Sequence, residues 1–173
     1  MCTQSRSMTA LASIFMIAAV AVLGGTQASQ TKSDTYAWNG ELVSLDSAAK
    51  TMTVKARVAY EDAISELKQF KSGDRVWILW SGVQDYSDAV RQVRRREAGR
   101  PIDEGLVLPA ELASTEAPNQ YITIRVRVPE TGLSAIKTMK PGQWVTVTSR
   151  HRPSSDDDAV VAVTPYVSTT ATD

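Results

Sequence analysis

The sequence predicts an all-β fold with two short helices, arranged as two tandem β-β-α-β-β repeats. Three observations lead to this prediction. The strand pattern at Thr53 to Val58 returns about seventy residues later at Thr123 to Val128. Each copy is followed by an apolar stripe of helical spacing and then by a Lys-x-Gly turn. Matches that recur in the same order are typical of one supersecondary unit built twice.

The clearest strands are residues 52–58 and 122–128. In both, apolar side chains occupy every second position, and polar or charged side chains fill the positions between them. A period of two with one polar face is typical of a strand that is buried on one side. The predicted inward residues are Met52, Val54, Ala56 and Val58 in the first copy and Ile122, Ile124, Val126 and Val128 in the second.

A short helix is expected next in each copy. Apolar residues recur there every three residues, so they share one stripe of a helix or of a single long turn. Gly73 and Gly142 then stand where the chain has to turn, and Pro141 fits a turn as well. The two stripes are Ile64, Leu67 and Phe70, and Leu133, Ile136 and Met139.

The remaining strands are expected at 40–45, 75–80 and 88–95 in the first copy and at 110–115, 143–148 and 158–163 in the second. Read alone, residues 87–94 also fit a capped basic helix. Their counterpart, 159–164, has a plain strand pattern, and this decides for a strand. Trp38 corresponds to Leu108, and we expect it to anchor the core at the first strand.

The N-terminal segment is predicted to be a secretory signal peptide. Arg6 is followed by an apolar run of about 14 residues, and small residues precede a cleavage site between Ala28 and Ser29. An uncleaved membrane anchor is the alternative, but a spanning helix needs about 20 apolar residues. We therefore expect an exported protein, periplasmic or extracellular.

The predicted organisation is a signal peptide (1–28), a disordered N-terminus (29–35), a first repeat (36–96), a linker (97–107), a second repeat (108–167) and a disordered C-terminus (168–173). The mature chain has no cysteine, since the one cysteine is Cys2. Its charge is near balance, because loss of Arg6 leaves 18 Lys and Arg against 19 Asp and Glu. A near-neutral chain argues against general nucleic-acid binding. No segment after the signal peptide is apolar enough to span a membrane.

Residues 40–46, 50–55 and 67–77, together with the turn at 139–147, resemble a family of small exported OB-like barrels. The family includes bacterial proteins of unknown function and periplasmic copper chaperones of the CusF type. The resemblance covers about 60 residues of each repeat. It implies two OB-like barrels packed together, which bind ligands on one face and its loops. One shared barrel of about eight strands is the alternative, because a four-stranded unit leaves edges to close.

No cofactor or metal is predicted. The copper chaperones bind their metal through His, Met and Trp, whereas this mature chain has one histidine, His151, and two methionines at core-facing positions. Asp156, Asp157 and Asp158 are consecutive, while calcium loops space their carboxylates by one residue. We expect a solvated hairpin tip there.

A non-enzymatic function is predicted. The sequence carries no Gly-x-Ser-x-Gly motif, phosphate-binding glycine loop or zinc-ligand spacing. His151 lies in a polar loop between two arginines and is the one histidine available to a catalytic triad. An enzyme that uses His151 is the remaining alternative.

Trp77 and Leu79 are the predicted binding residues. They lie on the outward face of their strand, where the second copy has threonines. An exposed apolar patch marks a contact surface, here for the other repeat, a second subunit, a protein partner or a ligand. Trp144, which corresponds to Arg75, is expected at the same contact.

A basic stretch gives the alternative binding site. Its arginines would bind an anionic ligand, such as a polysaccharide, a lipid headgroup or a nucleic acid, with an anionic polymer as the main expectation. The same stretch also fits a solvated edge strand, where charge discourages aggregation. The residues are Arg91, Arg94, Arg95, Arg96 and Arg100.

Overall fold

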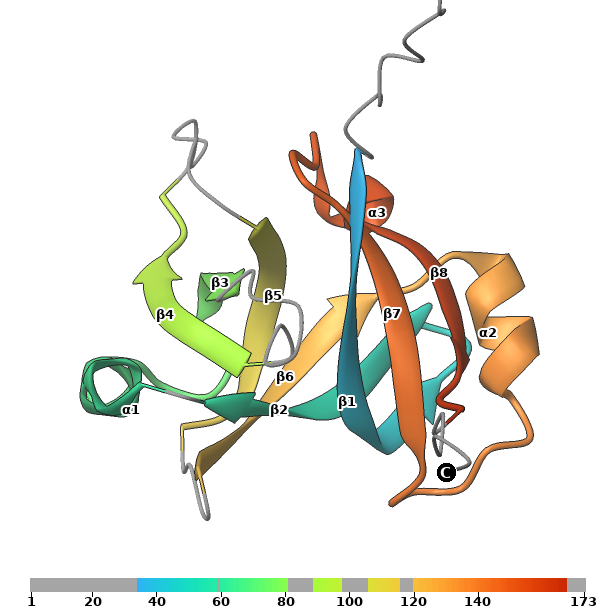
Figure 1. Ribbon diagram of the computed structural model, residues 1–173, viewed down its shortest axis with the longest axis horizontal. Coiled ribbons are helices and arrows are strands. Elements are labelled where there is room, and N and C mark those ends of the chain that lie inside the picture. The colour runs from blue at the N-terminus through green and yellow to red at the C-terminus, as the bar shows by residue number, and fades with distance from the viewer. Residues whose placement is uncertain (1–33, 59, 81–88, 98–105, 116–119, 168–173) are drawn as a thin grey trace, which may run out of the picture. The chain divides into compact units, whose positions relative to one another are not determined.

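Strands from the two predicted repeats pair with one another in a single sheet. The computed structural model describes residues 34–58, 60–80, 89–97, 106–115 and 120–167, which all belong to the unit Lys32–Asp173. This described part contains eight strands and three helices (Figure 1). In chain order they are β1 (Thr35–Asp46), β2 (Thr51–Val58), α1 (Glu61–Leu67), β3 (Arg75–Trp80), β4 (Ala89–Arg95), β5 (Leu106–Ser114), β6 (Tyr121–Arg127), α2 (Glu130–Ile136), β7 (Trp144–Arg150), α3 (Asp156–Ala159) and β8 (Val160–Pro165).

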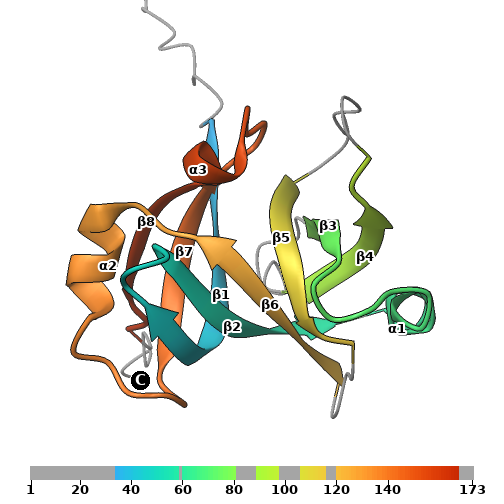
Figure 2. The same cartoon turned by 180° about the vertical axis from the view of Figure 1, so that it is seen from behind.

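The order of strands in the sheet is β4-β3-β5-β6-β2-β1-β7-β8. β2 and β6 run side by side through its middle (Figure 2). β3 of the first half pairs with β5 of the second, and β7 of the second half pairs with β1 of the first. β4 also pairs in parallel with β2, so that β2, β4, β3, β5 and β6 form a closed ring. The predicted division at the linker therefore does not separate two sheets.

The pairings of the two halves correspond at the offset seen in the sequence. Val54 lies opposite Ile124 in the β2–β6 pair, and these positions are 70 residues apart (124 − 54 = 70). The register shift that follows Leu42 in β1 recurs after Leu112 in β5. The strand order also reads the same from both ends of the sheet, with each strand replaced by its counterpart.

The predicted alternation in β2 and β6 is confirmed. Every predicted inward residue of these two segments is buried, whereas Arg57, Arg125 and Arg127 on the outward side are exposed. Thr53 is the exception among the outward residues, since it is only 8% exposed. It lies between its register partners, Ser44 of β1 and Arg125 of β6.

Trp38 packs between the ends of two corresponding strands. Its ring stacks on Trp80 at the end of β3, with 4.7 Å between ring centroids. Its Nε1 donates a hydrogen bond of 3.0 Å to the hydroxyl of Ser149 in β7. Ser149 occupies the position in β7 that Trp80 occupies in β3 (149 − 80 = 69). All three side chains are buried, so Trp38 anchors the core as predicted.

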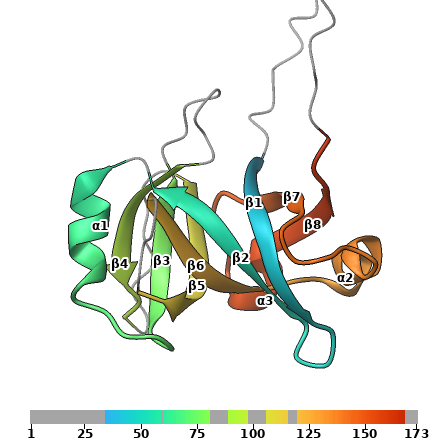
Figure 3. The ribbon, with the colours of Figure 1, turned by 90° about the horizontal axis from the view of Figure 1, so that it is seen from below.

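The two predicted helices are α1 and α2. α1 lies next to β4, and α2 lies next to β8 (Figure 3). Their apolar stripes pack on or into the main core. The turns that follow contain Gly73 and Gly142, with φ angles of 90° and 89°. This left-handed region favours glycine, because a side chain there meets its own backbone.

Several boundaries differ from the prediction. β1 begins at Thr35 rather than at residue 40, and β5 begins at Leu106, inside the predicted linker. Residues 156–158 lie in the connection between the antiparallel strands β7 and β8, where a hairpin tip was predicted. They form the helix α3, which was not expected, because Ser155 and Asp158 form a capping box that starts a helical turn. The segment at 88–95 is a strand from Ala89 onward, as its counterpart indicated.

Several predicted segments lie outside the described residues. They include the signal peptide with its cleavage site at Ala28 and Ser29, most of the linker, and the C-terminal tail. None of the helices in the described part of the chain has the length and apolar character that a membrane crossing requires.

Candidate functional site

Trp77 and Leu79 are buried, although they do lie on the outward face of β3. Their exposed fractions are 8% and 4%, and together with Val107 of β5 they form a small apolar cluster apart from the main core. Leu79 and Val107 are register partners, which explains their contact. The two side chains therefore do not form a patch that is exposed to a partner or ligand. Their contact is with β5 of the second half of the chain, and the other repeat was the first of the contacts expected from the sequence.

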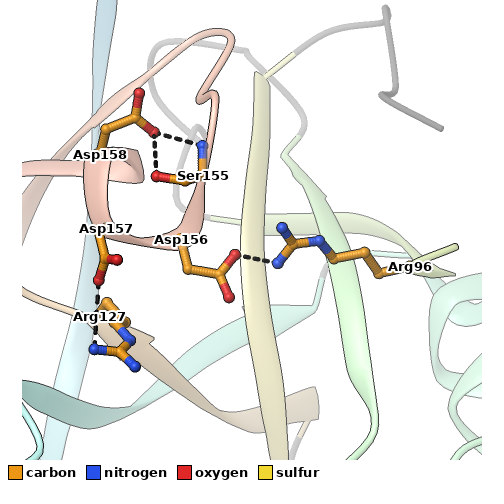
Figure 4. A network of polar contacts seen from close by, with 6 residues as sticks. All are labelled: Arg96, Arg127, Ser155, Asp156, Asp157 and Asp158. Carbon is orange, nitrogen blue, oxygen red and sulfur yellow. Dashed lines mark hydrogen bonds and ion pairs between the residues drawn. The ribbon is translucent and has the colours of Figure 1, made fainter. Parts of the chain in front are cut away.

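Arg96 covers the Trp77 ring. Its guanidinium carbon lies 4.7 Å from the centroid of that ring. The same guanidinium donates through Nη1 to a carboxylate oxygen of Asp156 in α3 (Figure 4). Both members of this ion pair are partly buried, with 22% and 33% of their side chains exposed. A cation above an aromatic face is attracted by the ring electrons, so Asp156 fixes a group that itself stabilises Trp77.

The three consecutive aspartates of α3 make three different contacts (Figure 4). Asp156 binds Arg96, and Asp157 lies 3.4 Å from Nη1 of Arg127. Asp158 accepts hydrogen bonds from the Ser154 hydroxyl at 2.6 Å and from the Ser155 backbone at 2.9 Å. Burial raises the pKa of Asp158, but these hydrogen bonds outweigh it and leave the pKa below its ordinary value.

The predicted basic stretch does not form one surface. Arg95 makes an ion pair of 3.5 Å with Asp74, and Nε of Arg94 donates to Gln92 at 3.0 Å. Neighbouring residues of a strand point to opposite faces, so Arg94 and Arg95 cannot serve the same ligand surface. Arg91 is exposed. The last arginine of the stretch, at position 100, lies outside the described residues.

Trp144 does not share a contact with Trp77, contrary to the prediction. It begins β7 and lies opposite Glu41 of β1, whereas Trp77 lies in β3 beside β4 and β5. Its ring is 39% exposed and stands 6.4 Å from the ring of Tyr166, which is 44% exposed. These two aromatic side chains form a separate, partly exposed pair.

A polar groove runs across the outer face of the sheet. Its floor is a row of successive register partners from five strands, which we call the Arg75 row. Two adjoining hollows lie along this row, with volumes of about 440 and 140 Å³. Both are lined by Thr51, Glu111, Arg125 and Arg127. The Arg75 row consists of Arg75 (β3), Glu111 (β5), Arg125 (β6), Thr53 (β2) and Ser44 (β1).

The two hollows have different ends. The larger one reaches Asp46 and Ala49 in the β1–β2 hairpin. The smaller one is bounded by Arg75 and by Asp156 of α3. Because α3 is held by ion pairs to Arg96 and Arg127, the wall of the smaller hollow is fixed to both halves of the chain.

Arg75 brings a positive charge to the floor of the smaller hollow. Glu111 lies between Arg75 and Arg125 in the row, and its Oε1 pairs with Nη1 of Arg125 at 2.6 Å. Arg75 is exposed, and within the described residues its guanidinium has no ion-pair partner. Two guanidinium groups therefore flank a single carboxylate.

A corresponding row crosses the other half of the sheet, and we call it the Trp144 row. It repeats the central ion pair, because Lys55 Nζ lies 3.2 Å from Glu41 Oε1. It differs at the first position, where Trp144 stands in place of Arg75. The Trp144 row consists of Trp144 (β7), Glu41 (β1), Lys55 (β2), Thr123 (β6) and Ser114 (β5).

No local pattern in the sequence indicates the groove. The outward residues of β2 and β6 show only a polar face, and the repeat matches Arg75 with Trp144 alone. The match between Glu41 and Glu111 was a usable signal, since each precedes a cationic residue by 14 positions (55 − 41 and 125 − 111). That signal does not show that β3 pairs with β5, and this pairing brings Arg75 beside Glu111.

Comparison with known proteins identified no relative. No protein family, curated protein or solved structure matched the chain. Within the described residues there is also no group of three His, Cys, Asp or Glu side chains placed to hold a metal ion. The resemblance to OB-like barrels accordingly stays an expectation.

Proposed function

We propose that this protein is an exported binding module that holds a small ligand in the groove along the Arg75 row. The observation that carries the proposal is the unbroken row of polar and charged residues across five strands, beneath two adjoining hollows. Ligand sites combine a hollow with a few convergent polar groups. The strands of a paired sheet hold such groups more rigidly than loops do.

The groove replaces the Trp77 and Leu79 face as the proposed contact surface. Those two side chains are covered, so a partner would first have to displace Arg96 from Asp156. The groove residues Thr51, Arg75 and Arg125 need no such displacement, because a hollow already lies above them.

Binding rather than catalysis remains our proposal. His151 packs edge-on against Tyr36, with 5.4 Å between ring centroids, and its backbone N–H donates to the carbonyl of Asp34 at 2.9 Å. His151 is not among the residues that line the two hollows. An acid–base role for this histidine would thus have to act away from the groove.

The proposed architecture is a duplicated OB-like unit whose two copies have exchanged strands. It is supported by the equal registers of β1–β7 and β3–β5 and by the corresponding bulges. Export is proposed from the N-terminal sequence alone. N-terminal sequencing of the secreted protein should begin at Ser29, and an intact N-terminus on the exported protein would contradict this cleavage.

Ligand mapping by NMR tests the groove. The mature protein is screened against sugars, peptides and small organic acids, and perturbed backbone amides should cluster at Ser44, Thr53 and Arg125. Ser44→Trp fills the larger hollow and should abolish binding. Ser134→Trp, on the exposed side of α2, is the matched control. Hits that perturb only Trp144 and Tyr166, or that survive Ser44→Trp, would overturn the proposal.

A further inference from the structure

We infer that the smaller hollow recognises a single oxyanion group of the ligand through Arg75. This inference rests on the proposed ligand-binding function of the groove, and it names the chemical class that the groove accepts. The group is a carboxylate, phosphate or sulfate, and the rest of the ligand extends into the larger hollow.

The smaller hollow has room for an oxyanion group. Its volume is about 140 Å³, and it is open to solvent on one side. The rest of the ligand would extend into the adjoining hollow, whose volume is about 440 Å³.

The charges around the smaller hollow leave one positive charge over. Its lining holds three guanidinium groups, Arg75, Arg125 and Arg127, and two carboxylates, Glu111 and Asp156. Arg125 pairs with Glu111, Asp156 with Arg96 and Arg127 with Asp157, so Arg75 is the lining charge without an ion-pair partner within the described residues. A ligand with one negative charge completes the balance.

The geometry of the guanidinium groups suits an oxyanion. Each ion pair of Arg125 and Arg127 uses one terminal nitrogen, Nη1, of a group that carries five N–H donors. One planar guanidinium can donate two parallel hydrogen bonds to two oxygens of the same carboxylate or phosphate. Arg75 can therefore contribute the principal contact and Arg125 or Arg127 a second one.

The other half of the chain provides an internal comparison. In the Trp144 row the central ion pair is kept, but an indole replaces the guanidinium of Arg75. An indole has one donor and no positive charge. Anion recognition should accordingly be confined to the Arg75 row.

Titration of the mature protein with inorganic phosphate tests the inference. Sulfate and acetate are titrated in parallel. Sodium chloride keeps the ionic strength constant, because a change in screening alone would shift the NMR signals of exposed charged groups. The readout is the backbone amide and arginine Nε–Hε signals. We expect saturable shifts at Arg75, Glu111 and Arg125 as the anion is raised through the millimolar range. The arm that saturates first identifies the class of oxyanion.

Three substitutions locate the site. Arg75→Gln should weaken binding by about tenfold or more, the scale for losing a hydrogen bond to a charged group. Arg91→Gln removes an exposed arginine of β4 and should leave the affinity unchanged. Arg75→Trp, which copies the residue of the Trp144 row, should behave like Arg75→Gln.

The outcomes separate this inference from the proposed function. Equal affinity in Arg75→Gln and wild type, or shifts confined to Arg91–Arg95, would overturn it. Lack of saturable shifts with all three anions would also overturn it. A neutral ligand that still maps to Ser44 and Thr53 would then leave the groove proposal standing.

Discussion

Val54 and Ile124 lie opposite each other in the β2–β6 pair and are also separated by the 70-residue offset that relates the two halves. An antiparallel pair has a local two-fold axis at its centre. Corresponding residues that face each other place this axis between the two halves of the chain. The β1–β7 pair corresponds in the same way to the β5–β3 pair. The parallel β2–β4 pair is the exception, since no β6–β8 pair occurs among the described strands.

Gly73→Ala and Gly142→Ala should each destabilise the fold by about 1 kcal/mol, the cost of a side chain in the left-handed region. The added Cβ would meet no atom within 4 Å at either site, so the cost comes from the backbone alone. Urea unfolding of the two variants measures it. Because the two turns correspond, the two variants should lose the same stability. Asn at either position should cost less stability than Ala. A neutral result at either turn would contradict the assigned backbone conformation.

Gly132→Ala should destabilise the fold, although alanine is the better helix former by about 1 kcal/mol. The added Cβ would lie 2.9 Å from Cγ1 of Val128 and 3.3 Å from Cγ2 of Val163. Such overpacking typically costs about 1 to 3 kcal/mol. Thermal unfolding measures the change, and the matched background is Val128→Ala. The loss should shrink in that background, and an equal loss in both would show that the close contact is not its cause.

The Arg96–Asp156 ion pair should contribute measurably to stability. A double-mutant cycle with Arg96→Ala and Asp156→Ala should give a coupling of about 1 kcal/mol, since both groups are partly buried and neighbours couple on this scale. The Lys50–Glu130 pair is the control, with side chains 56% and 78% exposed. Its coupling should be at most about 0.5 kcal/mol. Equal couplings for the two pairs would show that Arg96 does not hold α3.

Replacement of Trp77 by Thr should cost stability rather than a binding partner. The indole is 8% exposed and carries Arg96 on its face, and truncation of a buried tryptophan removes about 3 kcal/mol or more. Urea unfolding and gel filtration of the mature protein measure the two properties. Trp144→Arg is the control, because an exposed substitution should change stability by at most about 0.5 kcal/mol. Unchanged stability of Trp77→Thr with a changed elution volume would restore Trp77 as a contact residue.

Much of the secondary structure could be predicted because its signals are local. Alternation marks β2 and β6, and a stripe followed by a glycine turn marks α1 and α2. The helix α3 was missed, although Ser155 and Asp158 have the spacing of a capping box. The expectation of a hairpin tip at the three aspartates took precedence over that signal.

The candidate site was much less predictable. Arg75 and Glu111 are 36 residues apart in sequence (111 − 75 = 36), and only the pairing of β3 with β5 makes them neighbours. The burial of Trp77 was equally hard to predict from the sequence. Its side chain points outward from β3, but Arg96, which follows the end of β4, covers its ring.

The sequence by itself determined which segments are strands and which side of each strand is apolar, because both depend on residues close together in the chain. The tertiary structure decided which strands of the two halves pair with each other and which outward side chains are covered. The physical reason is that backbone hydrogen bonds are alike for every pair of strands. The choice of partner depends on side chains that pack together only after the chain has folded.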